Sequence, residues 1–224
     1  MNEKLNVPLS GAFHVKDPVS ALTHFIAFCA AVVAMPPLLV HAAIGGADFS
    51  ALASLSVFML TMVLLYGAST AYHTFQLSTC GVRILKKLDH IMIFYLIAGS
   101  YTPVCTVALD AAVGSRLLAL VWGLAAAGTL FKLCWVGCPK WVSSVIYIAM
   151  GWSCLTAMPQ VIAALSPSGF FWLLAGGVVY TAGGVIYALK PKNAVKRAFG
   201  HHELFHLFIM GGSLCHYIFM YHIV

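Results

Sequence analysis

The strongest constraint in this sequence is a succession of seven apolar stretches, each about 20 residues long. An α-helix of that length crosses a hydrocarbon core of about 30 Å, since it rises about 1.5 Å per residue. Only 8% of the 224 residues are charged, against about a quarter in soluble domains. We therefore predict an all-α polytopic membrane protein, a seven-transmembrane helix bundle that forms one domain over residues 1–224. The expected spans are 20–43, 51–73, 88–108, 116–135, 141–164, 170–189 and 203–224.

Proline and glycine shape these spans without interrupting them. Pro36 and Pro37, Pro103 and Pro159 fall inside apolar runs and predict local kinks, because neighbouring helices can satisfy the carbonyl groups that proline leaves free. The sixth span carries two glycine pairs, at 176–177 and 183–184, which predict close approach of another helix. The first apolar run is too long for a signal peptide and is followed by further spans, so we expect no cleavable signal.

The lysines and arginines predict the orientation. If the N-terminus is cytoplasmic, Arg116 is the single one of the twelve that falls outside, as the positive-inside rule requires. This arrangement predicts a multi-pass protein of the cell (inner) membrane with its C-terminus outside. The net charge of +6 lies in short loops between spans, so it is a topology signal, and nucleic acid is not an expected partner.

Two histidines four residues apart begin the last span. His202 and His206 share one helix face, and two imidazoles one turn apart form half of a zinc site that needs further ligands. His201 points about 100° away from His202 on the same helix. The alternative, that these histidines are polar residues at the membrane interface, stays open at this point.

Other spans bring suitable residues to the same predicted depth. His73 ends the second span, with Ser69 one turn deeper, and Asp89 begins the third. A carboxylate at the edge of an apolar run is costly without a partner, so this coincidence favours a metal site. Two alternatives remain: Asp89 pairs with Lys86 or Lys87, and Ser69 bonds only within its own helix.

The remaining histidines and the cysteines are weaker candidates. His24 could line the same cavity, His90 is interpreted as a supporting hydrogen-bond donor, and His216 as a buried hydrogen-bonding group. The seven cysteines are odd in number and scattered through apolar runs, so we interpret them as small core residues.

Several strings of the sequence resemble the bacterial hemolysin III family, which belongs to the progestin and adipoQ receptor group and is related to alkaline ceramidases. They lie at 17–24 (DPVSALTH), 69–73 (STAYH), 87–90 (KLDH), 98–103 (AGSYTP), 202–206 (HELFH) and 212–216 (GSLCH). The resemblance covers nearly the whole chain, with the strings in the family's order. It implies seven helices with a cytoplasmic N-terminus and a zinc ion bound by His73, His202 and His206. It also implies that Asp89 holds a water at the metal, with Ser69 beside it.

Such a site has a plausible reaction. Three neutral imidazoles leave Zn²⁺ an open position, where it can activate water and polarise a carbonyl. Asp89 can accept the proton of the water, and Ser69 can donate a hydrogen bond to the developing oxyanion. At the inner leaflet of an apolar bundle, the expected partners are membrane lipids, and the expected substrate is an acyl-chain lipid amide or ester.

Three other functions are weighed against the hydrolase. The first is a non-enzymatic membrane-homeostasis or lipid-sensing protein with a structural zinc. The second is an intramembrane metalloprotease that uses Glu203 of the HELFH string as general base and Asp89 as third ligand, which leaves His73 unexplained. The third is a lytic pore, for which the spans offer no polar stripe. Whether the chain is an enzyme, which lipid it takes and its oligomeric state stay open.

Overall fold

The computed structural model describes residues 14–189 and 200–224, and every regular element in this part of the chain is helical. Seven long helical segments are apolar enough to cross a membrane, which confirms the predicted class. The elements are α1 (Pro18–Ile44), α2 (Phe49–Thr74), α3 (Thr79–Pro103) with the π-helical turn η1 (Val104–Ala108), α4 (Ala111–Cys134), α5 (Lys140–Gly151), the 3₁₀ helix η2 (Trp152–Ala157), α6 (Met158–Ala164), α7 (Pro167–Leu189) and α8 (His201–Met220).

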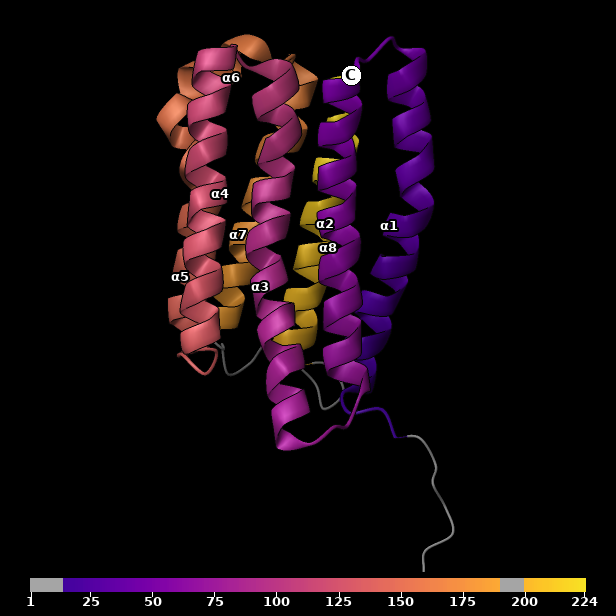
Figure 1. Ribbon diagram of the computed structural model, residues 1–224, viewed down its shortest axis with the longest axis vertical. Helices are drawn as coiled ribbons and strands as arrows, with labels where there is room; N and C mark the ends of the chain where they lie inside the picture. Colours follow the sequence, from indigo (N-terminus) through magenta and orange to yellow (C-terminus); the bar gives the residue numbers. More distant parts are fainter. Residues whose placement is uncertain (1–13, 190–199) are drawn as a thin grey trace, which may run out of the picture.

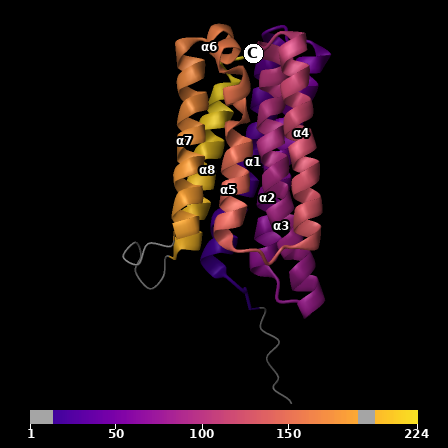
Figure 2. The same cartoon turned by 90° about the vertical axis from the view of Figure 1, so that its left-hand side faces the viewer.

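The helices stand side by side along the long axis of the molecule (Figures 1 and 2). α2 packs between α1 and α3, α7 packs between α5 and α8, and α8 closes the bundle against α1. The end at which α2 finishes with His73 and α8 begins with His202 is called the histidine end below. Its placement on the cytoplasmic side stays a prediction.

The helix bounds follow the predicted spans within a few residues, except at the start of α3. This helix begins at Thr79, nine residues before the predicted 88, and projects below its neighbours in Figure 1. Ser78 caps it, since its Oγ accepts a hydrogen bond from Gly81 N at 3.4 Å. The added turns carry Arg83, Lys86 and Lys87, and these three charges hide them from a search for apolar runs.

The proline positions differ in their effect. Pro36 and Pro37 lie within the continuous helix α1, whereas Pro103 is followed directly by the π-helical turn and Pro159 is the second residue of α6, just after the 3₁₀ helix. Proline has no N–H for the carbonyl one turn earlier, so the hydrogen-bonding pattern changes near these two residues.

The glycine and cysteine predictions have different outcomes. α7 and α8 approach closely: a Cβ at Gly183 would lie 2.6 Å from Cβ of Phe208, and one at Gly176 would overlap the ring of His216. The interpretation of the cysteines as core residues is wrong for most of them. Cys105 is buried, but Cys29, Cys80 and Cys134 are exposed and the others are half-buried, all as free thiols. An apolar span presents apolar side chains to lipid as well as to the core, so apolar surroundings in sequence do not imply burial.

Candidate metal centre

Three histidines from two helices converge at the histidine end. His73 lies in the last turn of α2, and His202 and His206 lie in the first turns of α8. One ring nitrogen of each falls within 4.8 Å of the other two, and His73 Nε2 lies 3.0 Å from His202 Nε2. His73 and His206 are each only 2% exposed. The structure thus brings together the three residues that the sequence singled out as ligands.

The start of α8 is fixed by Glu203. Gly200 N donates a hydrogen bond to Glu203 Oε2 at 2.7 Å, which satisfies a backbone donor at the helix N-terminus. Ser20 Oγ of α1 donates to Glu203 Oε1 at 3.0 Å. Both carboxylate oxygens are therefore engaged in capping α8 and joining it to α1.

Hydrogen bonds orient two of the three rings. His73 Nδ1 lies 2.9 Å from Asp17 Oδ2, and since a carboxylate only accepts, Nδ1 carries the hydrogen. The Thr23 hydroxyl donates to Ser20 O at 3.0 Å, so it accepts from His206 Nδ1 at 3.4 Å. These assignments follow from the hydrogen-bond network. Both rings then carry a lone pair on Nε2, which is the nitrogen a metal ion would take; in His73 this atom lies 3.0 Å from His202 Nε2.

The donor set suits a divalent metal ion. A tetrahedral zinc ion with bonds of about 2.0–2.1 Å holds its nitrogen ligands about 3.3 Å apart. The spacing of 3.0 Å between His73 and His202 is close to this, and one ring nitrogen of each of the three histidines lies within 4.8 Å of the other two. Three imidazoles leave a fourth position open. Imidazole also suits copper, iron and nickel, so the ligands alone define a metal site and not one element.

Asp89 and Ser69 lie beside this cluster and lack the partners that the alternatives required. Asp89 is buried, and within the described ranges the only carboxylate in an ion pair is that of Asp17. Lys87 Nζ instead donates to Leu133 O at 2.6 Å. Ser69 Oγ is buried and interacts with the Asp89 carboxylate instead of a carbonyl of its own helix, whereas its neighbour Thr70 bonds back to Tyr66 O at 2.7 Å.

The three weaker histidine candidates lie on the same pocket but differ in position. His24 stacks on His206 with ring centroids 3.5 Å apart, and neither of its ring nitrogens has a partner in the part of the chain described. His90 presents its backbone carbonyl to the Tyr147 hydroxyl at 2.9 Å. His216 lies ten residues beyond His206 on α8, with Nε2 3.3 Å from Leu173 O, which agrees with its predicted hydrogen-bonding role.

Asp17 and Thr23 are supporting residues that the sequence did not assign. Asp17 is hydrogen-bonded to His73, 56 residues away in the sequence, and Thr23 is hydrogen-bonded to His206, 183 residues away. Both belong to the string at 17–24. An acidic residue just before the first span was the available signal, because a carboxylate at that position requires a partner.

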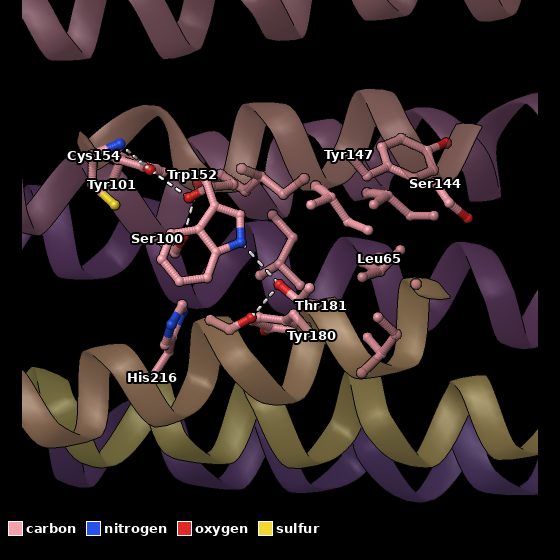
Figure 3. Close-up of a pocket in the computed structure, with 18 of the residues that line it drawn as sticks. Leu65, Ser100, Tyr101, Ser144, Tyr147, Trp152, Cys154, Tyr180, Thr181 and His216 are labelled. Carbon is pink, nitrogen blue, oxygen red and sulfur yellow. Dashed lines mark hydrogen bonds between the residues drawn. The ribbon is translucent and has the colours of Figure 1, made fainter. Parts of the chain in front are cut away.

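A long pocket starts at this centre. His202, His206, Ser69 and Asp89 line one end of it, and Val104 lies near the other. The fifteen residues from Asp89 to Val104 on α3 and η1 correspond to about 22 Å. The lining between these ends is mostly apolar, with side chains from α3, α5, α7 and α8. Figure 3 shows part of this pocket, with Tyr101, Trp152, Thr181 and His216 around it.

Seven helices that are long and apolar enough to span a membrane, with three histidines gathered at one end, define a class of integral membrane protein. Residues 13–217 match the model of the family described as "Haemolysin-III related", so the chain belongs to the hemolysin III family.

Individual relatives agree with this assignment. The chain is 35% identical to the "Hemolysin-3 homolog" of Bacillus subtilis (strain 168) over 202 residues, which covers 90% of this chain and 91% of the relative. It is 35% identical to "Hemolysin-3" of Bacillus cereus over 200 residues, 89% of this chain and 88% of the relative. The "Monocyte to macrophage differentiation factor" of Homo sapiens is 24% identical over 167 residues, 72% of this chain and 66% of the relative.

Proposed function

We propose that this protein is a zinc-dependent hydrolase of acyl-chain lipid amides or esters that acts at the inner leaflet of the cell membrane. The observation that carries the proposal is the meeting of two kinds of group in one pocket. Asp89 and Ser69 are buried and interact with each other, no ion pair of the described residues involves Asp89, and both residues line the pocket together with His202 and His206. A buried carboxylate without a cation beside it is costly unless a ligand or water engages it.

His73, His202 and His206 would hold the metal ion. A bound zinc ion supplies Lewis acidity at the substrate carbonyl and promotes ionisation of water at neutral pH. The Asp89 carboxylate would accept the proton of the attacking water. The Ser69 hydroxyl would donate a hydrogen bond to the oxygen on which negative charge develops. Glu203 takes no part, because its carboxylate caps α8 and accepts from Ser20.

The shape of the pocket supports a lipid substrate. Its length of about 22 Å along α3 exceeds the thickness of one leaflet's hydrocarbon region, about 15 Å. Apolar side chains such as Ile93, Leu96 and Ile97 line its middle, which suits an acyl chain. The concentration of lysines and arginines on one side of the spans supports the cytoplasmic leaflet.

The test is fatty-acid release from a panel of lipid amides and esters by purified, zinc-loaded protein, followed by mass spectrometry. We expect product from the wild type and a loss of roughly 100- to 10,000-fold in Asp89→Asn, with metal content unchanged because the three imidazoles remain. Glu203→Gln is the matched control and should stay near wild type. Absence of product from every lipid with the metal-loaded wild type, or equal rates in Asp89→Asn, would overturn the hydrolase.

A second candidate function is a lipid sensor with a structural metal ion. The observation that favours it is the number of helices joined at one point: α2 supplies His73, α8 supplies His202 and His206, and Asp17 at the start of α1 holds His73. A metal ion there would clamp three helices. If chelation loosens the bundle and no lipid is hydrolysed, the sensor replaces the hydrolase.

A further inference from the structure

A second polar group faces the pocket far from the metal centre. His216 lies ten residues after His206 on α8, a separation of about 15 Å along the helix. Its Nε2 lies 3.3 Å from Leu173 O, and because a carbonyl only accepts, Nε2 carries the hydrogen. Nδ1 is then a bare acceptor. It is buried and has no hydrogen-bond partner among the described residues.

Packing holds the His216 ring in one orientation. A Cβ on Gly176 of α7 would overlap Cδ2 of the ring and lie 2.5 Å from its Nε2, so this edge of the ring rests on the glycine. The Tyr180 ring meets it edge to face, with centroids 5.2 Å apart. The opposite edge, which carries Nδ1, therefore faces away from α7, and the ring lines the pocket (Figure 3).

The neighbouring polar groups do not supply the missing donor. Trp152 Nε1 donates to Thr181 Oγ1 at 2.9 Å, and the Thr181 hydroxyl donates to Gly177 O at 2.7 Å. The Tyr101 hydroxyl donates to Gly151 O at 2.6 Å, and Ser100 Oγ donates to Ile97 O at 2.8 Å. Each hydrogen is directed elsewhere, so a donor for His216 Nδ1 has to come from what occupies the pocket.

We propose that His216 Nδ1 accepts a hydrogen bond from a hydroxyl group on the acyl chain of the bound lipid. The inference rests on the proposed function for placing the lipid's polar head at the metal centre. An extended chain advances about 1.2 Å per bond, so about 15 Å corresponds to roughly 12 bonds. The preferred ligand thus carries a hydroxyl near the middle of a long acyl chain, and the pocket distinguishes it from the unsubstituted chain.

The experiment compares the binding of 12-hydroxystearate, 2-hydroxystearate and stearate to purified zinc-loaded protein in nanodiscs, by displacement of a fluorescent fatty acid. The wild type should bind 12-hydroxystearate roughly 2- to 12-fold more tightly than stearate, the range that one neutral hydrogen bond supplies. His216→Phe should remove this preference, so that 12-hydroxystearate and stearate bind this variant equally. 2-Hydroxystearate, with its hydroxyl beside the head group, should show no dependence on His216.

If His216→Phe does not fold, the variants His216→Asn and His216→Gln test the same hydrogen bond. Asn places its amide near the position of Nδ1 and Gln near that of Nε2, so His216→Asn should retain part of the preference and His216→Gln should lose it. Equal binding of 12-hydroxystearate and stearate by the wild type, or a preference that survives in both His216→Phe and His216→Gln, overturns the inference. Binding is measured without turnover. A protein that prefers 12-hydroxystearate but releases no fatty acid would therefore contradict the proposed hydrolase activity and still support the hydroxyl-binding role of His216.

Discussion

Two buried polar clusters lie at the histidine end of the bundle, and they differ in how their hydrogen bonds are used. Lys132 of α4 is completely buried. Its Nζ donates to Ser143 Oγ at 2.6 Å and to Cys138 Sγ at 3.2 Å, and these two atoms lie 3.2 Å apart. In the histidine cluster, by contrast, His73 Nε2 and His202 Nε2 face each other at 3.0 Å, and two of the rings donate outward through Nδ1.

This difference separates a structural cluster from a binding site. Around Lys132, each polar atom has a protein partner, so the cluster joins the end of α4 to the start of α5 without any ligand. At the histidines, one ring nitrogen of each residue lies within 4.8 Å of the other two, and in the described part of the chain no ion pair involves the Asp89 carboxylate next to them. A metal cation binds where the unprotonated ring nitrogens of several histidines lie close together, while the N–H group of each ring donates to a residue outside the cluster.

The largest expected effect is the loss of the metal ion. Wild-type protein should carry about one zinc ion per chain, and His73→Ala should retain less than about a tenth of it, because two imidazoles alone do not complete a site. Metal content would be measured by mass spectrometry of the purified protein. Lys132→Ala is the matched control from the other cluster and should keep its metal. If His73→Ala kept its full zinc content, the contrast between a metal-binding histidine cluster and a structural Lys132 cluster would be contradicted. The scheme in which Asp89 is a metal ligand would then be favoured.

Asp17 sharpens the comparison, because it acts on the metal only through His73. Asp17→Asn should weaken zinc affinity by about 10- to 100-fold, as is usual when the carboxylate that orients a ligating histidine is lost. A competition titration with a chromophoric chelator measures this change. Asp110, which precedes α4 at the other end of the bundle, provides the control in Asp110→Asn. Equal affinity in Asp17→Asn and the wild type would mean that the contact of 2.9 Å does not orient the ring.

Lys132 tests the structural side of the comparison. Lys132→Ala should destabilise the protein by about 1–3 kcal/mol, since its buried stem no longer packs and Ser143 and Cys138 lose a donor. Lys132→Met keeps most of the stem and should lose less. Thermal unfolding in detergent measures both variants at equal metal content. A large fall in zinc affinity without a change in unfolding would show that this cluster serves the metal centre.

The fold was largely predictable because the apolar runs reveal the spans directly. The histidine trio was also predictable, since the spacing of His202 and His206 and the depth of His73 are local or positional properties. Asp17, Thr23 and the buried state of Lys132 were not, because they depend on contacts between helices. Lys132 counted in the sequence only as a positive charge near the membrane surface, whereas the structure buries it against Ser143 of the next helix.

The smallest expected effect belongs to Glu203, and it separates the hydrolase from the metalloprotease. Glutamine can replace glutamate in a capping box, and its side-chain oxygen can still accept from Ser20 or from Gly200, so Glu203→Gln should keep its zinc and lose less than about 0.5 kcal/mol of stability. Glu203→Ala removes both contacts and should lose about 1 kcal/mol, the usual effect of a missing cap. Thermal unfolding and metal content would be measured together, beside lipid hydrolysis. A protease of the HExxH type would respond in the opposite way, with Glu203→Gln stable and metal-loaded yet inactive. That outcome would transfer the role of base from Asp89 to Glu203, and the buried carboxylate of Asp89 would then be the third metal ligand, as the HExxH scheme requires.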